Sequence, residues 1–67
     1  MKDQWTKIYS SCFIHKVEIA QAVLETNNIE SVIVNKQDSN YLFGEIELHV
    51  NVEQAMEANQ ILIKQEL

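Results

Sequence analysis

Cys12 and His15 are the first residues whose types and spacing suggest chemistry. They lie three positions apart, so their side chains would share one face if this stretch begins a helix. A helix N-terminus lowers the pKa of a thiol, and a nearby imidazole can assist its ionisation. The pair is therefore a candidate redox-sensing thiol, or half of a metal site shared across a dimer. The alternative is structural: a small side chain near a helix cap, and a solvated histidine.

His49 is the second candidate. It alternates with Glu47 and Glu45, so in a strand an acidic neighbour would lie on the same face. Such a pair can bind a metal ion or titrate near neutral pH. The alternative is an ordinary histidine on an exposed or dimer-facing sheet surface.

Other catalytic patterns do not occur in the sequence. The glutamates are spread over the whole chain, and no two are spaced for acid–base catalysis. Ser10 and Ser11 lack the neighbouring glycines of a phosphate-binding loop, and we interpret them as N-terminal caps of a helix. We therefore expect no catalytic residue, no cofactor and no enzymatic activity.

Size and charge narrow the class of protein further. The 67 residues predict a single α+β domain, residues 1–67, with little buried core. The single cysteine excludes an intrachain disulfide, which favours a homodimer as the source of extra stability. The net charge of −5, without arginine, argues against binding of nucleic acid or of an anionic membrane. No apolar run resembles a membrane span or a signal peptide, so we expect a cytoplasmic location.

Hydrophobic periodicity predicts the elements of the first half of the chain. Alternating β-branched and aromatic residues predict a strand over 6–10, and helical spacing predicts a helix over 13–26. Asn27 and Asn28 end this helix, because asparagine tolerates the left-handed backbone conformation of a C-terminal cap. The predicted buried stripe consists of Phe13, Val17, Ala20, Val23 and Leu24, with Ile19 widening it on one flank.

The second half contains two strands and a helix. Residues 29–36 predict a strand whose centre is apolar on both faces, and a polar turn over 37–40 follows it. A third strand over 45–50 buries Ile46, Leu48 and Val50 on one face. Asn51 caps a final helix that begins near residue 52. Its expected buried stripe is Val52, Ala55, Ala58 or Asn59, and Leu62, with Ile61 beside it.

This order of elements defines the expected fold. The order strand–helix–strand–strand–helix predicts a ferredoxin-like β-α-β-β-α arrangement. If the third strand lies between the other two, the sheet is three-stranded and antiparallel, with both helices on one face. We expect the fourth strand of the full ferredoxin-like plan to be missing, which would leave the outer edge of the first strand open.

The face of the sheet away from the helices is a candidate interface. There we expect Trp5, Lys7 and Tyr9 to share a side with Ile33 and His49. An apolar patch on an uncovered sheet suits a protein partner or a second copy of the chain. The alternative is that Trp5 and Tyr9 shield a small core.

A second candidate contact segment follows the polar turn. Tyr41, Leu42 and Phe43 are large apolar residues directly before Gly44, which suits a bulge or a positive backbone φ. They form a contact patch if they are exposed at a hairpin tip. We favour the alternative, in which they extend the third strand.

Several segments together resemble a known family. The runs KIYSS (7–11), EIA (18–20), VLE (23–25), NIES (28–31), NKQDS (35–39) and GEIELHV (44–50) resemble short bacterial domains described as putative prokaryotic signal-transducing proteins. The similarity extends from about residue 5 to residue 63, and Asn28 stands where family members often have glycine. The resemblance implies a fold similar to that of the PII nitrogen-signalling proteins, and a signalling role. It supplies no catalytic residues. PII proteins bind nucleotide with long loops and basic residues, which this sequence lacks, so we expect no nucleotide.

The resulting functional hypothesis is a regulatory interaction module that acts through protein contacts, as a homodimer or with a protein partner. The alternative is a sensor domain that binds a small molecule or metal ion through Cys12, His15 or His49.

Overall fold

The computed structural model describes residues 4–36 and 44–65. The elements in chain order are strand β1 (Trp5–Ser11), helix α1 (Ile14–Thr26), strand β2 (Ser31–Asn35), strand β3 (Ile46–Asn51), the 3₁₀-helix η1 (Val52–Gln54) and helix α2 (Ala55–Lys64). The predicted order of strands and helices is therefore confirmed.

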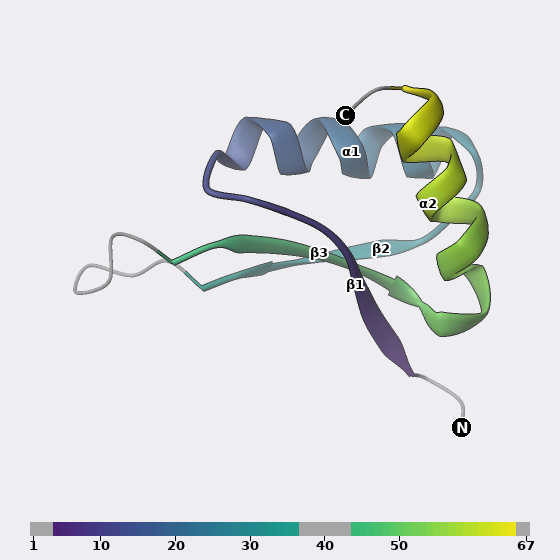
Figure 1. Ribbon diagram of the computed structural model, residues 1–67, viewed down its shortest axis with the longest axis horizontal. Coiled ribbons are helices and arrows are strands. Elements are labelled where there is room, and N and C mark those ends of the chain that lie inside the picture. Colours follow the sequence, from purple (N-terminus) through teal and green to yellow (C-terminus); the bar gives the residue numbers. More distant parts are fainter. Residues whose placement is uncertain (1–3, 37–43, 66–67) are drawn as a thin grey trace.

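The three strands form one antiparallel sheet in the order β1-β3-β2. Helices α1 and α2 both lie on one side of this sheet, and the opposite side carries no helix among the described residues (Figure 1). The α+β, ferredoxin-like fold and the central place of the third strand are confirmed. We call the side without helices the open face.

The core lies between the helices and the sheet. The alternation along β3 directs three side chains toward the helices, which contribute their own small and branched residues. The buried set is Val17, Ala20, Leu24, Ile29, Ile46, Leu48, Val50, Ala58 and Leu62. Burial of one large aliphatic side chain contributes about 1.5–3 kcal/mol, so these few residues supply most of the stabilisation available to so short a chain.

Three residues of the predicted buried stripes are exposed instead. Phe13 precedes α1 in an extended conformation, so helical spacing does not govern its direction. Ile19 is two positions from the buried Val17, which turns it to the solvent side of α1 at about 100° per residue. Val52 belongs to η1, where the tighter winding changes the phase of the stripe.

The start of α1 differs from the prediction. The Ser11 hydroxyl accepts a hydrogen bond from the Phe13 N–H at 3.1 Å, but this contact precedes the helix. The N-cap position is Phe13, which makes no side-chain capping bond. The interpretation of Ser10 and Ser11 as caps is therefore wrong, because β1 continues through Ser11.

The predicted roles of asparagine at the end of α1 and at the start of the last helical segment are confirmed. Asn28 has a φ of 65°, in the left-handed region. Its N–H donates to the Glu25 carbonyl, and the Ile29 N–H donates to the Leu24 carbonyl at 2.9 Å, which satisfies the last carbonyls of α1. The Asn51 side chain accepts from the Glu53 N–H at 2.9 Å and caps η1. The chain therefore turns at both predicted positions.

A β-bulge in β1 changes the predicted open face. Lys7 lies opposite His49, but the next paired residue, Tyr9, lies opposite Leu48, which leaves Ile8 as the extra residue. Residues directly opposite each other project to the same side of a sheet. Tyr9 therefore faces the helices and packs against the core together with Ile8. Its predicted place on the open face is wrong.

Ile33 is also on the helix-covered side. It lies opposite the buried Leu48 and packs against the core. Its neighbours Val32 and Val34 lie opposite His49 and Glu47, so they face the open side instead. The predicted phase of this strand is wrong by one residue. The run Val-Ile-Val is apolar throughout and contains no alternation that would fix its phase.

Candidate functional site on the open face

Side chains from all three strands meet on the open face. Strand β3 contributes Glu47 and His49, because the residues that alternate with them, Ile46, Leu48 and Val50, are buried in the core. The pairing registers place residues of both edge strands on the same side. These are Trp5, Lys7 and Ser10 from β1, and Val32 and Val34 from β2.

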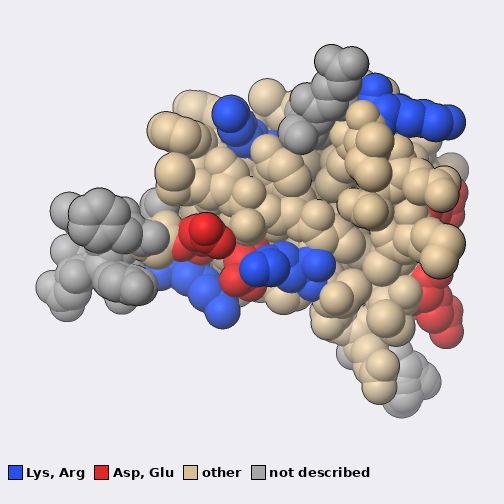
Figure 2. Space-filling view, in the orientation of Figure 1, with Lys and Arg blue, Asp and Glu red and all other residues tan. Residues whose placement is uncertain are grey.

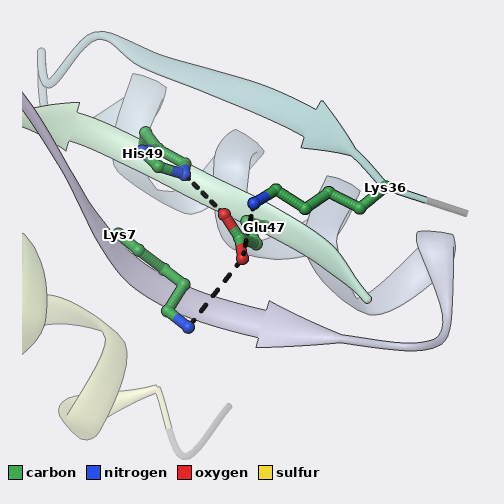
Figure 3. Close-up of polar contacts among 4 residues, drawn as sticks. All are labelled: Lys7, Lys36, Glu47 and His49. Atoms are coloured by element: carbon green, nitrogen blue, oxygen red, sulfur yellow. Dashed lines mark hydrogen bonds and ion pairs between the residues drawn. The ribbon is translucent and has the colours of Figure 1, made fainter. Parts of the chain in front are cut away.

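Glu47 is the centre of a charged group that we call the Glu47 cluster, made up of Lys7, Lys36, Glu47 and His49 (Figure 3). One carboxylate oxygen lies 2.9 Å from His49 Nε2. The other lies 3.7 Å from Lys36 Nζ and 3.9 Å from Lys7 Nζ. The Glu47 side chain is 14% exposed. A carboxylate can only accept, so His49 donates from Nε2 in this arrangement.

The hydrogen bond to His49 is the strongest contact of the cluster. The lysine side chains are about half exposed, and water screens such ion pairs, so each lysine contributes little to stability. The hydrogen bond from His49 lowers the pKa of Glu47 below its ordinary value of 4.5. Burial acts in the opposite direction, and Lys36 and Lys7 add to the lowering. Glu47 therefore stays ionised to lower pH than an isolated glutamate.

This lowered pKa predicts a pH-dependent difference between the wild-type chain and Glu47→Gln. Because the folded pKa is below the unfolded one, the carboxylate stabilises the fold above pH 4.5, and this contribution is lost as pH falls through the folded pKa. We expect the difference in free energy of unfolding to be constant near neutral pH and to fall in acid to the pH-independent difference between a protonated glutamate and a glutamine. Urea titrations at a series of pH values measure it.

His49→Phe is the control for that experiment. Removal of the main hydrogen-bond donor raises the pKa of Glu47 toward its ordinary value, so the loss of stability should begin at higher pH. A difference between wild type and Glu47→Gln that is the same at every pH would contradict the role of the carboxylate.

A shallow apolar depression adjoins the cluster. It has a volume of about 330 Å³ and is lined by Trp5, Val32, Val34 and His49. Trp5 and Val32 are 40% and 42% exposed. His49 belongs to both the depression and the Glu47 cluster, so an apolar pocket and fixed charges lie next to each other. Figure 2 shows acidic and basic side chains side by side over the strand region, beside an uncharged surface.

The other predicted residues lie elsewhere. Cys12 is exposed in the link between β1 and α1, and His15 is exposed in the first turn of α1. Within the ranges 4–36 and 44–65, no group of three or more His, Cys, Asp or Glu side chains is placed to hold a metal ion. Tyr41 and Phe43 lie outside the described residues.

Sequence analysis placed Trp5, Lys7, Glu47 and His49 on this face but missed Val32 and Val34. The side of the sheet on which Val32 and Val34 lie could not be predicted, because their strand is apolar throughout. The contacts of Lys7 and Lys36 with Glu47 depend on cross-strand register. The acidic–apolar alternation of β3 was the signal that correctly placed Glu47 beside His49.

Comparison with known protein families matches nearly the whole chain. A family model described as putative prokaryotic signal transducing protein matches residues 5–66. Comparisons with curated proteins and with solved structures found no match. Among the described helices, none has the length and apolar character needed to cross a membrane. Because the family model covers nearly the whole chain, the resemblance seen in the sequence is confirmed, and the chain belongs to the family of putative prokaryotic signal transducing proteins.

Proposed function

We propose that this chain is a non-enzymatic regulatory module of a cytoplasmic signalling system, which forms a homodimer and acts by binding a protein partner on its open face. The family membership supports the signalling role. The observation that carries the proposal is the depression lined by Trp5, Val32, Val34 and His49 on the open face, which no described helix covers (Figure 1). Sheets usually bury their apolar faces against another layer, and here a partner supplies that layer.

The arrangement of the open face indicates what a partner presents to it. An apolar side chain fills the depression beside Trp5 and Val32, where it displaces water from exposed apolar surface. Lys7 and Lys36 are about half exposed, so each ammonium group can also contact an acidic or hydroxyl group of the partner. Glu47 then holds both lysines in place. The expected partner surface is therefore an apolar residue flanked by acidic or polar groups.

Val32→Glu tests this function by placing a charge in the depression. We expect the tagged variant to retain at most a tenth of the protein captured from a native lysate by the wild type, which corresponds to about 1.4 kcal/mol. Quantitative mass spectrometry of the captured proteins measures the loss. Circular dichroism checks folding, and Val32 is exposed enough to accept the change.

Ile19→Glu is the matched control. Ile19 is also an exposed β-branched residue, at 52% against 42% for Val32, but it lies on α1 at the other side of the molecule. It should leave capture unchanged. Equal capture by wild type and Val32→Glu would refute binding at the open face.

A further inference from the structure

We infer that a second copy of this chain pairs with the outer edge of β1, so that the two sheets become continuous and the two α2 helices pack against each other. The inference rests on the homodimer of the proposed function. It places that dimer at the β1 edge of the open face, where the dimer shares Trp5 with the depression and leaves the β2 and β3 side of the depression to a partner.

The outer edge of β1 presents main-chain groups for pairing. The Val52 N–H donates to the Gln4 carbonyl at 2.9 Å, so the main chain of Gln4 is directed toward the β3 side. Main-chain direction alternates along an antiparallel strand, so Trp5 and Lys7 direct their N–H and C=O groups outward. In the part of the chain that the structure describes, β1 has a neighbour on its β3 side alone. An uncovered edge of this kind is a template for another strand.

The bulge restricts how a second copy can pair. It follows Lys7, so the regular part of the edge is short and ends there. An antiparallel register centred on Thr6 places Trp5 of each copy opposite Lys7 of the other, with reciprocal main-chain hydrogen bonds. Both side chains face the open side, where the ammonium group can lie against the indole ring. The same positive-to-aromatic contact forms twice across the two-fold axis.

Helix α2 offers an uncharged flank beside this edge. A hollow of about 440 Å³ lies between β1 and α2, lined by Thr6, Lys7, Ile8, Ala55, Met56 and Asn59. Met56 and Ile63 are 77% and 66% exposed. At about 100° per residue they share one flank with Asn59, whereas the charged Glu57 and Lys64 are turned away from it. Exposed apolar residues on a flank without charges suit contact with an identical helix.

One symmetry operation satisfies both surfaces. A two-fold axis through Thr6, perpendicular to the sheet, pairs the β1 edges and brings the α2 flanks together in antiparallel orientation. Burial of Trp5, Val52, Met56 and Ile63 on both copies removes on the order of 1,000 Å² from water, which is the lower limit for a specific interface. A chain without a disulfide and with a small core gains the stability that it otherwise lacks.

A cysteine cross-link tests the register. Thr6 residues of the two copies would lie directly opposite, with Cα atoms about 4.5–5.5 Å apart, which suits a disulfide. In a Cys12→Ala background, we expect Thr6→Cys to form a covalent dimer on mild oxidation. Val32→Cys in the same background is the control, and it should remain monomeric on a denaturing gel. Cross-linking of Val32→Cys without cross-linking of Thr6→Cys would overturn the inference.

Light scattering after size-exclusion chromatography tests the α2 contact. We expect the wild type to be a dimer, Met56→Glu to dissociate at least tenfold more readily, and Val32→Glu to remain a dimer. Met56 is solvent-exposed in the single chain, so its substitution should leave folding intact, as circular dichroism can check. A Met56→Glu dimer as stable as wild type would refute the inference. If Val32→Glu alone dissociated, the dimer would lie on the open face instead. A monomeric wild type would refute the dimer itself. Capture from a lysate tests partner binding separately.

Discussion

Replacement of Leu48 by alanine should lower the free energy of unfolding by about 2–5 kcal/mol. Leu48 is fully buried at the centre of β3, the strand that pairs with both others. It lies opposite Tyr9 on one side and Ile33 on the other, and both pack against the core. A cavity here cannot be filled by small movements of one element, because all three strands meet at this point. Urea denaturation followed by circular dichroism measures the loss.

The size of this effect matters because the domain is small. A core of this kind rarely supplies more than about 3–5 kcal/mol of net stability, so Leu48→Ala should leave a large fraction of the chain unfolded at 25 °C. Val32→Ala is the matched control, since Val32 lies on the neighbouring strand but is partly exposed on the open face. It should cost less than about 1 kcal/mol. Similar losses for both variants would contradict the division of the sheet into a buried and an open face.

The second large effect is expected at Asn28, which has a φ of 65°. A β-branched residue is strongly disfavoured in the left-handed region, so Asn28→Val should destabilise the fold by roughly 1–3 kcal/mol. For a domain of this size, each 1 kcal/mol lowers the melting temperature by about 4–8 °C. Differential scanning calorimetry of the variant and the wild type gives this shift directly.

Asn28→Gly separates backbone conformation from loss of the side chain. Glycine adopts positive φ without steric cost, so this variant should melt within a few degrees of the wild type, although it also lacks the amide. If Asn28→Gly and Asn28→Val were equally destabilised, the asparagine side chain would be responsible, and the backbone explanation would fail.

Local sequence was sufficient to predict the order of the elements and much of the core. Strict alternation in 46–50 identified the two faces of β3, because a strand that covers a core must bury every second residue. The paired asparagines marked the end of α1, because few residues other than glycine tolerate the left-handed position. These features depend on neighbours in the chain, so they can be read without knowledge of the fold.

Tertiary pairing decided which residues face the open side. β1 pairs with β3 on both sides of the bulge between Lys7 and Tyr9. The extra residue at the bulge, Ile8, directs the Tyr9 side chain toward the core. In β2, every central residue is apolar, so only the register against β3 determines that Ile33 is covered while Val32 and Val34 are not.

His49 and Glu47 show the same division within the candidate site. Their alternation on one strand placed them on a common face, and their hydrogen bond was foreseeable from sequence. The ion pairs of Lys7 and Lys36 with the same carboxylate were not foreseeable. These lysines are distant from Glu47 in the chain and contact it only across the sheet. The sequence by itself therefore determined the order and approximate positions of the strands and helices, because short-range periodicity and backbone preference control them. The composition of the open face was decided by strand register, which is a property of the assembled sheet.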